Sequence, residues 1–328
     1  MFRTMRPYFI ALACSWTAII VCAIFYSKQH PQLHWITTAA LPAFMAEAMF
    51  YLGAIFYETR LRVAMLPSRR FQALLLWLSA VLPYLLFTLL AGTFSRNAFV
   101  LVALLSALLS YWFVLFPRRT SYDIGFLIVA AAPVVLRVFK RLYLSPDPHL
   151  RIDVLGHLAW IHTGIAALLI LREWDPGAFG LWPKAREWRI GFLWFAISIV
   201  PIALVALAVH DVRFEPAQGD WWRIAGTAIG TFFGFLWVVA LSEELFFRGV
   251  IERALLDSTR SKIAAVLVSA ILFGSVHLTF HQFPNWPAAI VASVLGAACG
   301  VAYAESGSVR APMVTHALVV ATGRVLFQ

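Results

Sequence analysis

Charged residues and cysteines are both scarce in this chain of 328 residues. Asp, Glu, Lys and Arg make up 13% of the sequence and hydrophobic residues 62%, whereas a soluble domain has roughly 25% charged and about 45–50% apolar residues. This balance excludes a disordered chain, a coiled coil and an ordinary soluble enzyme. The three cysteines, Cys14, Cys22 and Cys299, lie within apolar runs, which predicts neither a disulfide framework nor a thiolate metal site.

Acidic residues are fewer than basic ones, and the formal net charge is +10. In a soluble chain this excess would suggest a nucleic-acid partner. Here the basic residues fall between apolar runs, where membrane topology explains them better. We therefore expect the protein to be embedded in a lipid bilayer and to bind no nucleic acid.

Apolar windows of membrane-spanning length recur along the whole sequence. They predict an all-α fold, a polytopic transmembrane helical bundle with about 10–11 membrane helices, of which the fifth and the last are short. The expected spans are 8–26, 35–57, 72–94, 98–117, 124–139, 154–171, 190–209, 224–245, 263–280, 288–304 and 311–327.

The basic residues also predict the orientation of the chain. Of the 26 Lys and Arg residues, 17 lie in segments on the side of the N-terminus. The positive-inside rule then places the N-terminus in the cytoplasm, and we expect a multi-pass protein of the bacterial cytoplasmic (inner) membrane. A basic cluster at 137–151 falls on the opposite side, and every later loop would be reversed if the fifth span did not cross.

A polar break at 172–189, rich in Gly, Pro and charge, predicts a domain boundary. Residues 1–189 form an N-terminal transmembrane helical region of unknown role, and residues 190–328 carry the motifs described below. Ionisable residues at membrane depth are costly and usually functional. The N-terminal region offers Glu47, His157 and His162, for which we favour a polar contact between helices or a snorkelling group.

The last hundred residues contain a denser set of ionisable groups. Glu243 and Glu244 follow an apolar run in the segment LSEELFFRG, and Arg248 comes four residues after Glu244. On a helix this spacing makes Glu244 and Arg248 neighbours that can form an ion pair. Glu243 points about 100° away from Glu244, so its carboxylate is predicted to stay free.

Histidines follow in two of the later apolar runs. Phe273 and His277 share one helical face in FGSVH, and His316 lies in APMVTHA. With a turn near Arg260, Glu244 and His277 would each lie roughly 25 Å from that turn and meet at one level. One helix from 222 to 257 would exceed the membrane core, which predicts either a protrusion or a break near Gly249.

The order EExxxR, FxxxH and a histidine in the last helix resembles the CPBP family of CAAX-processing and bacteriocin-processing intramembrane proteases, relatives of the Ras-converting prenyl endopeptidase. The resemblance covers residues of about 220–327 and is carried most specifically by EELFFRG. It implies an intramembrane endopeptidase that hydrolyses a membrane-associated or lipidated peptide or protein near its C-terminus.

The same resemblance implies a role for each motif residue. Glu243 would be the catalytic glutamate that activates water, and Glu244 would pair with Arg248. His277 would hold or polarise the water, and His316 would stabilise the oxyanion.

One position departs from the family pattern. The family usually has HxxxN in the third motif, with the Asn in the oxyanion hole, and this sequence has Val320 there. The two asparagines of the chain, Asn97 and Asn285, do not fit the motif. Since one oxyanion donor is worth about 10²–10³ in rate, Thr315, Ser275 or a backbone N–H would have to replace it.

Two mechanisms remain open. In the favoured one the site has no cofactor, and a glutamate acts as general base. In the other, a metalloendopeptidase-like site binds Zn²⁺ through Glu243, Glu244, His277 and His316, and the metal activates the water. His281, four residues after His277, has the spacing of a second imidazole ligand, although the sequence lacks HExxH.

Two further functions compete with proteolysis. A non-catalytic CPBP homologue acting as a membrane scaffold is suggested by Val320. A multi-helix transporter would suit the number of helices, but it predicts paired helix breaks in two halves, and the sequence shows no such repeat.

Overall fold

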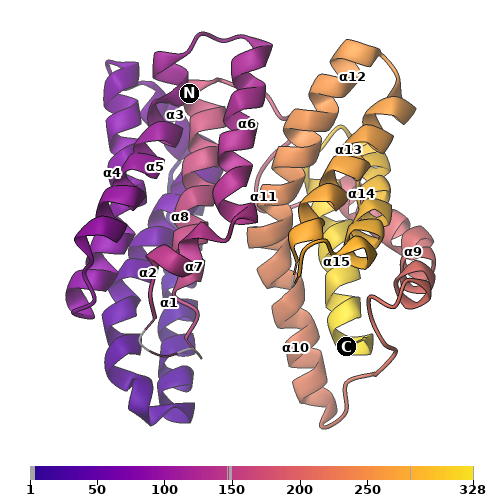
Figure 1. Cartoon of the computed structure of the whole chain (residues 1–328), viewed down its shortest axis with the longest axis horizontal. Helices are drawn as coiled ribbons and strands as arrows, with labels where there is room; N and C mark the ends of the chain where they lie inside the picture. Colours follow the sequence, from indigo (N-terminus) through magenta and orange to yellow (C-terminus); the bar gives the residue numbers. More distant parts are fainter. Residues whose placement is uncertain (1–3, 146, 148–149, 281, 328) are drawn as a thin grey trace. The chain divides into compact units, whose positions relative to one another are not determined.

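The computed structural model describes residues 4–145, 147, 150–280 and 282–327 and divides into two compact units, Met1–Trp174 and Asp175–Gln328. No residue in these described ranges belongs to a β-strand, apart from two isolated bridges. The predicted all-α fold is therefore confirmed. Figure 1 shows the helices of both units.

The N-terminal unit consists of helices joined by short loops. Its elements are α1 (Arg6–Gln29), η1 (Pro31–Leu33), α2 (His34–Ile55), α3 (Tyr57–Ala64), α4 (Arg69–Leu90), α5 (Arg96–Leu115), α6 (Thr120–Val135), α7 (Val138–Leu142), α8 (Asp153–Ala166) and the π-helical turn η2 (Ala167–Leu171). Helices α2, α4 and α8 contact one another and form the centre of this unit.

The C-terminal unit contains all the predicted motifs. Its elements are α9 (Ala185–Ala208), α10 (Trp221–Gly234), η3 (Phe235–Val239), α11 (Ala240–Glu244), η4 (Leu245–Glu252), α12 (Arg253–Thr259), α13 (Lys262–Val276), η5 (His277–Thr279), α14 (Trp286–Ser306) and α15 (Arg310–Leu326). Helix α15 lies against α9, α10, α11 and α14, as Figure 1 shows for α10 and α11.

Each of the eleven predicted spans corresponds to a helix. Among the described residues, nine helices are long and apolar enough to cross a membrane. The other two are the ones expected to be short, α6 with 16 residues and α15 with 17. Large apolar side chains such as Ile263 and Ile271 are 74% and 64% exposed, as expected of helices that face lipid. The chain is an integral, multi-pass membrane protein.

The division between the two units follows Trp174, which lies within the predicted polar break at 172–189 and before the expected start of the second region at residue 190. Residues 175–189 belong to the second unit because several of them bond to its helices. The Glu187 carboxylate accepts hydrogen bonds from Ser308 and Arg310, each at 2.7 Å. The Tyr303 hydroxyl donates to the carbonyl of Pro176 at 3.4 Å. These long-range contacts leave no trace in local composition.

The helix that carries the two glutamates continues from Trp221 to Thr259, a length of 39 residues. It would span about 58 Å at 1.5 Å per residue, so part of it extends beyond a hydrocarbon core of about 30 Å. The alternative of a break at Gly249 is wrong. Instead, η3 and η4 are π-helical, and a single α-helical turn, α11, separates them.

Small residues let α13 and α14 approach closely. An added Cβ at Gly274 would overlap the Oγ of Ser293 and the carbonyl oxygen of Ala289, and one at Gly296 would lie 3.1 Å from the Cα of Ala270. Such close contact between membrane helices depends on small side chains. It fixes the position of Phe273, which is 1% exposed in the core between these helices.

Replacing Gly274 by Ala should therefore destabilise the protein by about 1–3 kcal/mol, because the added methyl group overpacks the α13–α14 contact. Thermal unfolding in detergent measures the loss. The matched control is Gly226→Ala in α10, where an added Cβ meets nothing within 4 Å. Equal melting temperatures for the two variants would contradict this account of the packing.

Candidate active site

The two adjacent glutamates occupy different environments. Both lie in α11, the single α-helical turn between two π-helical segments. The Glu244 side chain is fully buried, whereas that of Glu243 is 33% exposed. π-Helical turns inside longer helices are frequent at functional sites, because the wider turn changes where side chains point.

Glu244 is held by two basic side chains. Its Oε2 accepts a hydrogen bond from Arg248 Nε at 3.0 Å, and its Oε1 accepts one from His316 Nδ1 at 2.8 Å. The predicted pair with Arg248 is thus present. The contact with His316 joins two residues 72 positions apart and connects the EExxxR motif to the last helix.

Arg248 is also fully buried, and it contacts other groups besides Glu244. Its Nη1 donates to Ser269 Oγ at 2.7 Å and lies 3.6 Å from Glu252 Oε2, and its guanidinium lies 5.4 Å from the ring centroid of Phe273. The sequence reasoning missed Ser269 and Glu252. Glu252 had a signal, since it follows Arg248 by four residues just as Arg248 follows Glu244.

The ring of Phe273 lies between the two candidate histidines. Its centroid is 4.9 Å from that of His277 and 5.7 Å from that of His316. His277 Nδ1 donates to the Phe273 carbonyl at 2.9 Å, and the imidazole stacks on Phe280 at 5.1 Å. These contacts fix the ring and leave its Nε2 as the nitrogen available to other groups.

Glu243 faces the histidines. Its Oε2 lies 3.9 Å from His316 Nε2, and it interacts electrostatically with His277. Because His316 uses Nδ1 for Glu244, its Nε2 is directed to Glu243. The structure therefore brings Glu243, Glu244, His277 and His316 together, with Arg248 behind them. His281, the other histidine considered, lies outside the described residues.

The side chains expected to replace the missing oxyanion donor already make other hydrogen bonds. The hydroxyl of Thr315 donates to the carbonyl of Gly191 at 3.0 Å, and that of Ser275 to Leu272 at 2.7 Å. Asn285 caps helix α14. The hydroxyl protons of Thr315 and Ser275 are thus already donated, so these side chains do not replace the oxyanion donor that an Asn at position 320 would supply. Of the expected replacements a backbone N–H is left, and the Nε2 atoms of His277 and His316 become donors only when those rings are doubly protonated, because each Nδ1 already makes a hydrogen bond.

A metal ion would find a different donor set from the predicted one. Donor atoms of Glu244, Cys299 and His316 lie within 4.8 Å of one another, whereas the predicted set was Glu243, Glu244, His277 and His316. Both Glu244 oxygens already accept hydrogen bonds, and the Arg248 cation adjoins them. A buried cation beside a divalent metal is electrostatically unfavourable, so these residues fit a hydrogen-bonded network better than a Zn²⁺ site.

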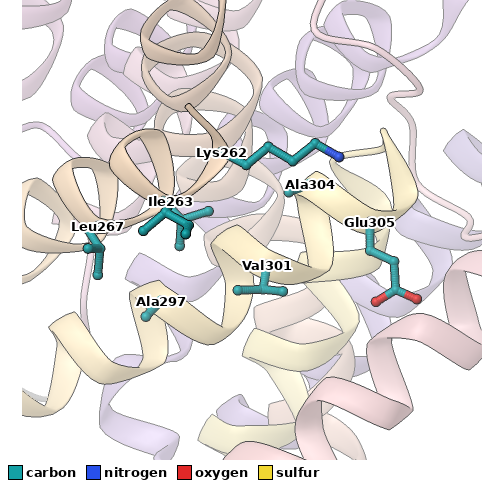
Figure 2. Close-up of a pocket in the computed structure, with 8 residues that line it drawn as sticks. Lys262, Ile263, Leu267, Ala297, Val301, Ala304 and Glu305 are labelled. Carbon is teal, nitrogen blue, oxygen red and sulfur yellow. The ribbon is translucent and has the colours of Figure 1, made fainter. Parts of the chain in front are cut away.

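A groove between α13 and α14, with a volume of about 550 Å³, lies away from these residues. Figure 2 shows its apolar lining, with Lys262 and Glu305 as its charged members. None of the five candidate residues lines it. Glu47, His157 and His162 belong to the N-terminal unit.

Comparison with known proteins supports the identity of this region. Residues 225–322 match the family model described as type II CAAX prenyl endopeptidase Rce1-like. The match covers the three motifs and confirms the resemblance to the CPBP family of membrane proteases. No curated protein and no solved structure matches the chain.

Replacing Arg248 by Ala should destabilise the protein by about 3–5 kcal/mol, because Glu244 would remain buried without its cation. The measurement is thermal unfolding in detergent. Arg223→Ala is the matched control on the same long helix, since that side chain is 71% exposed in its pair with Asp220 and should cost less than about 1 kcal/mol. A wild-type melting temperature for Arg248→Ala would refute a buried ion pair.

Proposed function

We propose that this chain is an intramembrane endopeptidase of the CAAX-processing type, in which Glu243 activates the water that hydrolyses the peptide bond. The observation that supports it is the unequal treatment of two neighbouring carboxylates. Glu244 is fully buried and bonded to Arg248 and His316, whereas Glu243 is partly exposed and faces two imidazoles. A general base needs such a free carboxylate within reach of water.

In this mechanism, a water molecule lies between Glu243 and the histidines. Glu243 takes one proton from the water, and the water oxygen attacks the carbonyl carbon of the scissile peptide bond. The proton then passes to the leaving amine as the carbon–nitrogen bond breaks. The products are a carboxylic acid and an amine, and Glu243 is regenerated.

His316 has two functions in this proposal. Its Nδ1–H bond to Glu244 fixes the orientation of the ring, so an N–H at Nε2 exists only when the imidazole is doubly protonated. The two glutamates beside it favour that cation. A charged imidazole aimed at the developing oxyanion stabilises the transition state, and it would compensate in part for Val320. Glu244 and Arg248 act as positioning residues.

The substrate is proposed to be a membrane-associated or lipidated peptide, cut near its C-terminus. The supporting observations are the position of Glu243 inside a membrane-spanning helix and the match to a prenyl endopeptidase family. No cofactor is required, because the chain supplies both a base and N–H donors.

Glu243→Gln should lower the rate of cleavage by about 10²–10⁴, because glutamine keeps the shape and removes the base. The assay uses purified protein and lipidated C-terminal peptides, with and without a chelator. Asp257→Asn, an exposed carboxylate on the same long helix, should keep wild-type activity. Near-normal turnover by Glu243→Gln would overturn the mechanism, and no turnover by the wild type would favour a non-catalytic scaffold.

The orientation is a second proposal, and it places the loop after α12 in the cytoplasm. Arg253, Arg260 and Lys262 lie in α12, at its end and at the start of α13, next to this loop, and the positive-inside rule assigns them to that side. Water and substrate then enter from the cytoplasmic leaflet of the bacterial inner membrane.

Cysteine labelling tests that orientation. Ser258→Cys, at an exposed position, should react with an impermeant maleimide only in inside-out vesicles. The exposed Cys14 and Cys22 are replaced beforehand, and the buried Cys299 is kept because it adjoins Glu244. Labelling in intact cells would reverse the topology of the C-terminal unit.

A further inference from the structure

The N-terminal unit contains a second cluster of ionisable groups, far from the first in sequence. Glu47 on α2, Ser79 on α4 and His162 on α8 meet where these three helices contact one another. His162 Nδ1 lies 2.7 Å from Glu47 Oε1, and His162 Nε2 lies 3.0 Å from Ser79 Oγ. Glu47 and His162 are 115 residues apart in the sequence.

Both ionisable groups are withdrawn from solvent. The side chains of Glu47 and His162 are each 1% exposed, and the second carboxylate oxygen of Glu47, Oε2, is buried without a hydrogen-bond partner in the described part of the chain. An unpaired buried polar atom is costly. A polar contact between helices needs no titratable group, because two amides or hydroxyls would make it without a buried charge.

The charge balance of this cluster requires a proton. Among the described residues, His162 is the basic group that faces Glu47, and the other titratable groups facing it are the phenols of Tyr51 and Tyr143. Ser79 and Thr163, which face the imidazole, are neutral. Asp153, near the start of α8, pairs with Arg151 instead.

An ionised Glu47 beside a neutral imidazole would therefore leave one uncompensated negative charge inside a membrane bundle. Burying such a charge is strongly unfavourable. The cluster is neutral only when it holds one proton more, either on the imidazole or on the carboxylate.

We propose that Glu47, His162 and Ser79 form an intramembrane proton-binding site, separate from the glutamate site of the C-terminal unit. The bound proton lies between Glu47 Oε1 and His162 Nδ1, and two forms share it, carboxylate with imidazolium and carboxylic acid with imidazole. Ser79 completes the site by hydrogen bonding to the other ring nitrogen. Chains of Glu and His at membrane depth are typical of proton relays, which gives the N-terminal unit a chemical function.

The order Ser, His, Glu also matches a hydrolytic triad, but two observations oppose that interpretation. Ser79 lies inside α4, whose backbone N–H groups there are used by the helix and cannot serve as oxyanion donors. In addition, the Ser79 hydroxyl donates to the carbonyl of Leu76 at 2.7 Å. A serine fixed in this way supports a proton site better than a nucleophile.

The pH dependence of thermal stability of the full-length protein tests the proposal. The wild type should lose stability as the pH rises into the alkaline range, because the folded state must then give up its proton and bury a negative charge. Glu47→Gln accepts the same hydrogen bond without a charge. It should abolish the alkaline loss and add a loss at acid pH, where a protonated His162 would have no counter-charge.

His162→Gln should have a different effect, because Glu47 must then hold the proton alone. The loss of thermal stability on raising the pH should begin at a lower pH than in the wild type. His157→Gln is the matched control on the same helix, since that ring bonds a backbone carbonyl, and it should keep the wild-type profile. Identical pH profiles for the wild type and Glu47→Gln would overturn the proposal.

A measurement on the wild type decides the question if the variants do not fold. In nitrogen-15 NMR of labelled histidines, the ring of His162, assigned through its neighbours in α8, should show a hydrogen-bonded proton at Nδ1, shared with Glu47. An assigned His162 ring without a hydrogen-bonded Nδ1 proton at neutral pH would exclude the site, whatever the state of the other eight histidines. Neither measurement depends on proteolysis, so the proton-binding site and the proposed protease activity are tested independently.

Discussion

The buried ion pair of Glu244 and Arg248 determines the arrangement of the C-terminal site. Both side chains are fully buried, and charges removed from water must find partners in the protein. Arg248 finds Ser269 on α13, and Glu244 finds His316 on α15. Three helical segments are thereby held in one register, and the geometry around Glu243 follows from bonds that Glu243 does not itself make.

The long helix supports this arrangement through its π-helical segments. In an ideal α-helix, residues four apart lie on one face, which suits Glu244, Arg248 and Glu252. The glutamates occupy the single α-helical turn, and η4, which carries Arg248, is π-helical. Bonds from each N–H to the fifth preceding carbonyl widen the turns. Glu244 and Glu243 approach the same histidine from different sides, 2.8 Å and 3.9 Å from its two nitrogens, as expected of adjacent residues about 100° apart on an α-helical turn.

Local spacing predicted the parts of the site that depend on one helix. The i,i+4 rule gave the Glu244–Arg248 pair, the FxxxH face gave the contact of Phe273 with His277, and the helices indeed turn at Arg260, which ends α12 in a left-handed conformation. Contacts between distant segments had no such signal. Ser269 and Cys299 are ordinary residues of apolar runs, and only the packed helices place them beside Arg248 and Glu244.

The same limit applies to the N-terminal unit, where spans were predicted well but the meeting of Glu47 and His162 was not. Both units contain a buried glutamate–histidine contact, at 2.7 Å in one and 2.8 Å in the other. Their charge balance differs. Arg248 supplies a permanent cation to Glu244, so His316 can gain or lose a proton while its neighbour stays charged. Glu47 has His162 as its basic partner, so one proton must stay with the pair. One contact thus suits acid–base catalysis and the other proton binding, and the difference depends on a single arginine.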